Sequence, residues 1–170
     1  MSFKNQTIVI TGAAGNLGSA VAKTFYEANA RVVLVDAKAD FLARRFPDSD
    51  SRDVKVPVNL LHRDLVLSAF AKIQDEHDGI DALCAIAGGF HMGETVHDTA
   101  TDIWELMNNL NVRTLLNSTA AVVPHMIERG GGKIVTIGAN AALRGVPGMG
   151  SYCAAKSTVM RLSLIHISEP

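Results

Sequence analysis

The feature that most constrains the fold lies within the first twenty-five residues. TIVIT (7–11) is an almost uninterrupted β-branched run, a pattern typical of a strand buried on both faces of a parallel sheet. The next residues are GAAGNLG (12–18), with glycines at both ends and in the middle. The apolar residues that follow recur at helical spacing: Leu17, Val21, Ala22 and Phe25. A strand, a glycine-rich turn and an amphipathic helix in direct succession predict the start of a βαβ unit.

The same alternation continues along the chain. Further strands are predicted at 31–36, 53–58, 81–89 and 133–138. Helices are predicted at 62–77, with Leu65, Ala69, Phe70 and Ile73 on one face, at 101–129, with Pro124 as a kink or boundary, and from about Ser151. Strands alternating with helices predict an α/β fold, a doubly wound parallel sheet (Rossmann) of about five strands.

Composition bounds the class of protein. The chain has 170 residues, 48% hydrophobic and 19% charged, which favours a single soluble domain. A formal charge of −1 gives no electrostatic basis for binding nucleic acid or an anionic membrane. Two cysteines fit a reducing compartment, and without a signal peptide or a spanning apolar run we expect a cytoplasmic protein. The histidines show no metal-ligand spacing, so no metal site is expected.

The glycine-rich turn is a candidate phosphate-binding loop. Glycine lets a phosphate approach the backbone, and the N-terminus of the following helix offers unpaired N–H groups and a positive dipole end. The turn could instead need glycine for steric reasons alone, but its place in the first βαβ unit favours phosphate binding. The residues assigned to cofactor binding here are Gly12, Ala14, Gly15, Asn16, Leu17 and Gly18.

Asp36, at the end of the second predicted strand, indicates which dinucleotide binds. An acid about 20 residues past the glycines accepts hydrogen bonds from the adenosine ribose hydroxyls and repels a 2′-phosphate. We therefore expect NAD to be preferred over NADP. Lys38 is close enough in sequence to soften that discrimination, and a solvated acid at a strand end is the alternative interpretation.

Tyr152 and Lys156 are four positions apart at the start of the last predicted helix. Residues at this spacing share one helix face, and a nearby ammonium favours the phenolate form of tyrosine. The pair can therefore serve as a general acid/base. A solvated helix pair is the alternative, which the position after the fifth strand of a dinucleotide-binding fold disfavours.

Taken together, these motifs resemble the short-chain dehydrogenases/reductases. The resemblance rests on TGAAGNLG (11–18), Asp36, AGG (87–89), the Asn111–Val112 pair, GGKIVTIG (131–138) and YCAAK (152–156), and it extends to about Arg161. It implies NAD(P)-dependent hydride transfer between a nicotinamide cofactor and a small carbonyl or alcohol substrate. It also implies a homo-oligomer when the chain is full length.

The resemblance assigns roles to particular residues. Tyr152 is implied as the acid/base, and Lys156 as the holder of the nicotinamide ribose. Asn111 is implied as the asparagine that holds a water in the proton relay, although Asn108 and Asn109 lie close by. The cofactor contacts after the fourth and third strands are implied at Ala87 and Gly88 and at Asn59 and Leu60.

The chain departs from the family pattern in two places that bear on function. Ala139 stands thirteen residues before Tyr152, where the family usually has a serine that binds the reacting oxygen, and Asn140 could replace it only by turning inward. The dihydropteridine reductases of this family also have alanine there, so a similar NADH-dependent reduction is an alternative activity. A non-catalytic dinucleotide-binding fragment is another. Asn16 replaces the middle family glycine, and we expect asparagine to tolerate the positive φ of that position.

The last nine residues, LSLIHISEP (162–170), do not read as a good continuation of the final helix. They are similar to a translated reading frame of a widely used sequencing adapter. We therefore expect residues 1–161 to form an incomplete NAD(P)-binding domain, lacking the last strands of the family fold, and 162–170 to be a non-native tail.

Overall fold

The computed structural model describes residues 2–47 and 52–165, which form two compact units. The first unit holds the described residues through Ala87 together with Asn117–Val135, and the second holds Gly88–Leu116 and the described residues from Thr136 onward. The single domain expected over residues 1–161 remains a prediction. No described helix combines the length and the apolar character needed to cross a membrane.

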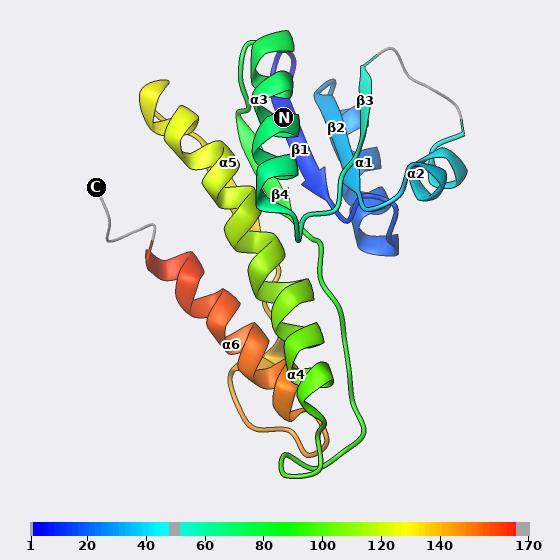
Figure 1. The fold of residues 1–170 in the computed structure, drawn as a ribbon. Coiled ribbons are helices and arrows are strands. Elements are labelled where there is room, and N and C mark those ends of the chain that lie inside the picture. Colours follow the sequence, from blue (N-terminus) through cyan, green and yellow to red (C-terminus); the bar gives the residue numbers. More distant parts are fainter. Residues whose placement is uncertain (1, 48–51, 166–170) are drawn as a thin grey trace. The chain divides into compact units, whose positions relative to one another are not determined.

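A five-stranded sheet organises the first unit (Figure 1). Its strands are β1 (Thr7–Thr11), β2 (Arg31–Asp36), β3 (Asp53–Pro57), β4 (Ala82–Ala85) and β5 (Lys133–Thr136). The spatial order is β3-β2-β1-β4-β5, and β1 pairs in parallel with both β2 and β4. The chain thus starts in the middle and winds outward to both edges, which confirms the predicted doubly wound sheet. β3, β4 and β5 end one to four residues earlier than predicted.

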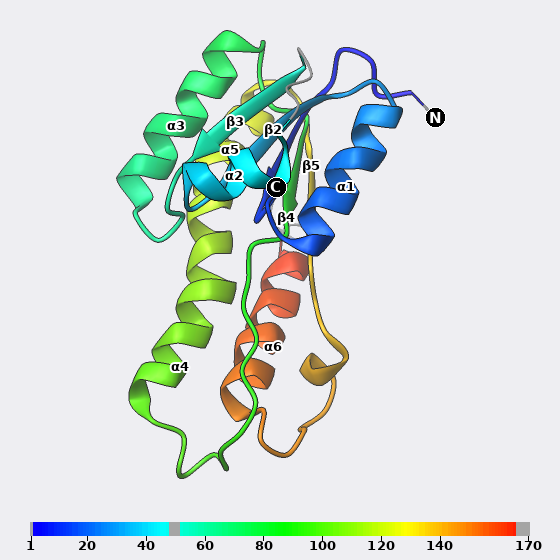
Figure 2. The same cartoon turned by 90° about the vertical axis from the view of Figure 1, so that its right-hand side faces the viewer.

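The helices of the first unit cover both faces of this sheet. These helices are α1 (Asn16–Glu27), α2 (Ala39–Arg45), α3 (Arg63–Glu76) and the greater part of α5 (Thr114–Glu128). Figure 2 shows α1 and α3 on opposite faces. One face buries Ile8 and Ile10 of β1 together with Ala22 of α1 and Leu42 of α2. Burial of such apolar surface is the main term that stabilises a layered α/β unit.

The buried face of α3 differs from the predicted face at Leu65. The helix buries Val66, Phe70 and Ile73, whereas Leu65 is 57% exposed. The expectation that Leu65 faces the core is therefore wrong. Val66, Phe70 and Ile73 follow the i, i+4, i+7 spacing of one helical stripe, and Leu65 lies one residue outside that stripe.

Three helical segments form the second unit with the loops between them. They are α4 (Thr101–Asn108), the π-helical turn η1 (Asn109–Arg113) and α6 (Gly150–Ile165), and a short 3-10 turn, η2 (Asn140–Ala142), precedes α6. Of the two expectations at Pro124, the boundary is wrong, because this proline lies inside α5, and the kink remains a prediction.

α6 runs four residues past Arg161, to Ile165. The expectation that 162–165 do not continue the helix is therefore wrong. The rest of the expected tail, 166–170, lies outside the described residues.

Candidate functional site

The glycine-rich turn between β1 and α1 is built so that two of its glycines have no substitute. Gly12 adopts φ +66, and a Cβ placed on it would lie 2.9 Å from the Cα of Ala87. A Cβ on Gly18 would collide with the carbonyl oxygen of Gly12. Gly12 therefore allows the segment after β4 to pass close to the turn, and Gly18 allows α1 to start directly over it.

The N-terminus of α1 is open to an anion. Its N-cap, Gly15, supplies no side-chain hydrogen bond, and the first turn carries no acidic residue. Within the described part of the chain, the amide N–H groups at this end therefore have no capping side chain, and the helix dipole adds positive potential there. Asn16 is the first residue of α1 and does not have a positive φ. The expectation that this position needs a left-handed backbone is wrong, and asparagine fits without strain.

Asp36 connects the end of β2 to this turn. Its Oδ2 accepts a hydrogen bond from the N–H of Ala14 at 3.0 Å, and its Oδ1 accepts one from the N–H of Ala37 at 2.8 Å. The carboxylate is half-buried. Because a carboxylate has about four lone-pair sites, Asp36 can hold the turn and still accept hydrogen bonds from a ligand hydroxyl.

The residues after β3 play a structural part in the first unit. Asn59 accepts the N–H of Leu61 on its Oδ1 at 3.0 Å. Leu60 is buried, 6% exposed, and its carbonyl oxygen accepts the side-chain N–H of Asn117 at 2.8 Å. Adenine contacts for Asn59 and Leu60 remain predictions.

Thr11 is a residue that the sequence analysis missed. It is the last residue of β1, is 1% exposed, and its Oγ1 accepts the N–H groups of Ile86 and Ala87 at 3.1 and 3.2 Å. Thr11 therefore fixes the segment after β4 against the glycine turn. The signal in the sequence is a hydroxyl residue directly before Gly12.

In the second unit, Asn111 lies at the centre of a buried hydrogen-bond cluster. Its side chain is 2% exposed. The Nδ2 donates to the carbonyl oxygens of Met107 at 2.9 Å and Gly89 at 3.1 Å, and the Oδ1 accepts the N–H of Gly89 at 3.3 Å. Asn111 lies in the π-helical turn, an irregularity frequently found at functional sites.

Lys156 converges on the same cluster from α6. The Cβ that Gly88 lacks would lie 2.8 Å from Oδ1 of Asn111 and 3.6 Å from Nζ of Lys156. The lysine is 7% exposed, and its Nζ donates to the carbonyl oxygen of Ile137 at 2.8 Å. Burial lowers the pKa of Lys156, because desolvation penalises the charged ammonium.

Tyr152 lies next to Lys156 on α6. The Nζ of Lys156 is 6.0 Å from the centroid of the Tyr152 ring, so the two residues share a helix face as predicted. Phe90 packs edge-to-face on the same ring, with centroids 5.0 Å apart. Ala139 has an extended backbone and caps η2, and its methyl side chain offers no hydrogen-bond donor.

The predicted site residues therefore fall into two sets. Gly12, Ala14 and Asp36 meet around the turn of the first unit. Gly88, Asn111, Tyr152 and Lys156 gather in the second unit. The first set can hold an anion and a hydroxyl-bearing ligand. The second set places a buried cation beside a phenol, which is the arrangement that proton transfer requires.

The chain is similar to known proteins over most of its length. A family model described as short chain dehydrogenase matches residues 6–166. The chain is 28% identical over 168 residues to an NAD-dependent glycerol dehydrogenase of Listeria innocua, covering 99% of this chain and 66% of the relative. It is also 28% identical over 172 residues to the 3-oxoacyl-acyl-carrier-protein reductase FabG of Thermotoga maritima, covering 99% and 70%.

A solved structure, the apo form of LigO from Sphingobium sp. strain SYK-6, superimposes with a TM-score of 0.89 at 27% identity. The match covers 96% of this chain and 63% of LigO. The chain therefore spans about two thirds of the length of these relatives.

Proposed function

The chain belongs to the short-chain dehydrogenase family, and we propose that it is an NAD(P)-dependent oxidoreductase. It transfers a hydride between a nicotinamide cofactor and a small carbonyl or alcohol substrate, with Tyr152 as the acid/base. Asp36 makes NAD the preferred cofactor, because a 2′-phosphate beside its carboxylate would be repelled.

The residues of the first unit fit a dinucleotide. Gly12 leaves room at the turn, since a Cβ there would lie 2.9 Å from Ala87. The first turn of α1, Asn16 to Gly18, offers N–H groups to the diphosphate. Asp36, whose Oδ2 accepts a hydrogen bond from the N–H of Ala14 at 3.0 Å, also accepts hydrogen bonds from the ribose hydroxyls. The bound nicotinamide supplies or accepts the hydride.

The second unit supplies the proton chemistry. Tyr152 holds the proton that passes to or from the substrate oxygen. Lys156 lies beside it, with its Nζ 6.0 Å from the centroid of the phenol ring, and holds the nicotinamide ribose. The carbonyl oxygen of Ile137 fixes the ammonium at 2.8 Å. Asn111, 2% exposed, is hydrogen-bonded to Gly89 and holds a water of the proton relay.

One observation carries this proposal: a buried lysine beside an only partly buried tyrosine in the same unit. A buried charge is costly unless it is paired and hydrogen-bonded. Here one carbonyl oxygen accepts from the Lys156 ammonium. An ammonium kept buried beside a phenol at this cost favours a functional role over a purely structural one.

The test measures NADH oxidation with a panel of small carbonyl compounds, using the wild-type chain and Tyr152→Phe. Loss of a general acid typically lowers the rate by about 10²–10⁴-fold. We expect Tyr152→Phe to lose turnover by that factor while NADH affinity, followed by cofactor fluorescence, stays within about twofold, a change of well under 1 kcal/mol. Equal turnover by the two proteins would contradict the role of Tyr152.

Ala139 favours a second candidate, the reduction of a quinonoid dihydropterin by NADH. Its side chain has no donor for the substrate oxygen, and losing one such donor typically costs about 10²–10³ in rate for substrates that need it. A quinonoid dihydropterin belongs in the same panel. If it alone is reduced, and Ala139→Ser confers no gain on simple ketones, the second candidate is the correct one.

A further inference from the structure

We propose that Arg45, at the end of α2, is a cofactor-binding residue that adds a positive charge beside the diphosphate. The proposal rests on the proposed function, because it concerns the same dinucleotide. It assigns a residue that is far in sequence from the glycine-rich turn.

The first observation is a hydrogen bond between two elements of the first unit. The Nη2 of Arg45 donates to Oδ1 of Asn16 at 2.6 Å. Asn16 is the first residue of α1, so the guanidinium lies within one short side chain of the N–H groups that begin this helix. A phosphate docked on those N–H groups would therefore be near a cation.

The second observation is that Arg45 keeps donors for a ligand. A guanidinium has five N–H donors in a fork that matches phosphate oxygens. Among residues 2–47 and 52–165, Arg45 has no carboxylate partner within ion-pair distance, and its side chain is exposed. Its neighbour Arg44 differs, because it pairs with Asp40 at 3.0 Å and packs on Phe41 with its guanidinium carbon 5.2 Å from the ring centroid.

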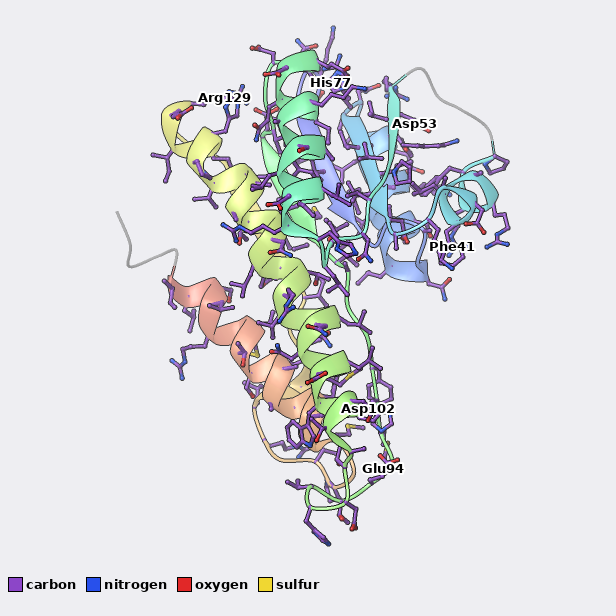
Figure 3. The ribbon with its side chains drawn as sticks, in the orientation of Figure 1. Phe41, Asp53, His77, Glu94, Asp102 and Arg129 are labelled. Atoms are coloured by element: carbon purple, nitrogen blue, oxygen red, sulfur yellow. The ribbon has the colours of Figure 1, made fainter. Side chains whose placement is uncertain are left out.

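The third observation is where the other two cations at α2 lie. Figure 3 shows Phe41 on this helix, and the Nζ of Lys38 lies 5.3 Å from its ring centroid. Lys38 and Arg44 are thus drawn to the Phe41 ring, and Arg45 alone reaches Asn16. Asn16 therefore acts as a tether: its hydrogen bond holds Arg45, one of these three cations, near the start of α1.

The experiment compares NADH and ADP-ribose affinity in the wild-type chain, Arg45→Ala and Arg44→Ala, at low and high salt. The two variants lose the same charge from adjacent positions of one helix. We expect Arg45→Ala to weaken both ligands by about tenfold at low salt, the worth of one charge-assisted contact. The effect should shrink at high salt, since exposed charges are screened. Arg44→Ala should bind like the wild type.

Two further variants separate a ligand contact from a structural one. Asn16→Gly removes the tether but keeps the charge, and should lose a part of the affinity that Arg45→Ala loses. Arg45→Lys keeps the charge without the fork, and should also be intermediate. All variants should unfold at the wild-type temperature, because the Arg45–Asn16 contact is at the surface.

Several outcomes would overturn the proposal. If the wild-type chain binds NADH and Arg45→Ala binds it equally well, the role of Arg45 is wrong while the proposed function stands. The same holds if Arg44→Ala loses as much affinity as Arg45→Ala, because the loss would then reflect the positive charge of α2 as a whole and not a contact made by Arg45. If the wild-type chain binds neither ligand, the proposed function and the role of Arg45 both fail.

Discussion

Some residues of the second unit are important because they are small and leave room for neighbouring side chains. Gly88 is the clearest example, since a Cβ there would lie 2.8 Å from Oδ1 of Asn111 and 3.6 Å from Nζ of Lys156. The sequence motif AGG (87–89) predicts a cofactor contact through the backbone. The structure adds a steric reason for glycine: both neighbours of the missing Cβ are buried, polar side chains with fixed hydrogen bonds.

Replacement of Gly88 should therefore be destabilising. In Gly88→Ala the new Cβ would lie 2.8 Å from Oδ1 of Asn111, and overpacking of this kind costs about 1–3 kcal/mol. Urea unfolding measures the change. Gly145→Ala is the matched control, because a Cβ there meets no atom within 4 Å. A Gly88→Ala variant as stable as that control would contradict the steric account.

The sequence identifies some residues better than others. Asn111 could not be separated from Asn108 and Asn109 by composition, and the family resemblance alone selects it. In the structure the side chain of Asn111 is 2% exposed and hydrogen-bonded to Gly89, and its role in the proton relay remains a prediction. Arg45 could not be found from sequence, because its contact with Asn16 joins residues 29 positions apart.

At the scale of elements, regular strands are the most predictable part of the chain. The bounds of β1 and β2 are as predicted, since continuous β-branched runs define them. The predicted strand at 81–89 ends at Ala85, because Thr11 captures the N–H groups of Ile86 and Ala87. These two hydrogen bonds depend on Thr11, which is far from β4 in sequence. The hydrophobic pattern of β4 therefore does not predict where the strand ends.

The helices show the same limit. The seven-residue α2 was not predicted, since it is too short for a clear apolar period. The π-helical turn at Asn109–Arg113 interrupts a run that reads as one continuous helix. Its central residue, Asn111, bonds to Gly89 outside the helix, so tertiary contacts accompany the irregularity.

The bridge made by Thr11 gives a prediction about these elements. Thr11→Val keeps the shape but removes the acceptor, which leaves the N–H of Ala87 without its partner. A buried donor left unpaired costs about 1–3 kcal/mol, so we expect the free energy of unfolding to fall by that amount. Thr11→Ser retains the hydroxyl and should recover most of the loss. Equal stability of Thr11→Val and the wild type would show that the bridge is unimportant.

At the scale of the whole molecule, the described helices and strands make up an α/β chain of about two thirds the length of its relatives. β5 is one edge of the sheet, and its Val135 is 52% exposed. The fold class, a doubly wound parallel sheet, follows from sequence, whereas the strand order and the division into two units do not.

Stability should depend on pH through His77, which Figure 3 shows beside α3. Its Nε2 is buried and has no hydrogen-bond partner among the described residues. Burial and then the nearby Arg31 lower the pKa of His77. Below about pH 6.5, the usual histidine value, the unfolded chain therefore binds a proton that the folded chain resists.

We therefore expect the free energy of unfolding to fall as the pH drops below about 6.5. His77→Gln cannot titrate and should lose that part of the slope. Urea unfolding of both proteins between about pH 5 and 8 measures it. An unchanged slope in His77→Gln would mean that other groups cause the acid sensitivity.

The central claim is that the turn at Gly12–Gly18 and the carboxylate of Asp36 together select NAD. Fluorescence titration of the chain with NADH and with NADPH tests it most directly. The account predicts saturable NADH binding at least about tenfold tighter than NADPH binding, a difference of about 1.4 kcal/mol. No binding of either cofactor, or a tenfold preference for NADPH, would contradict it.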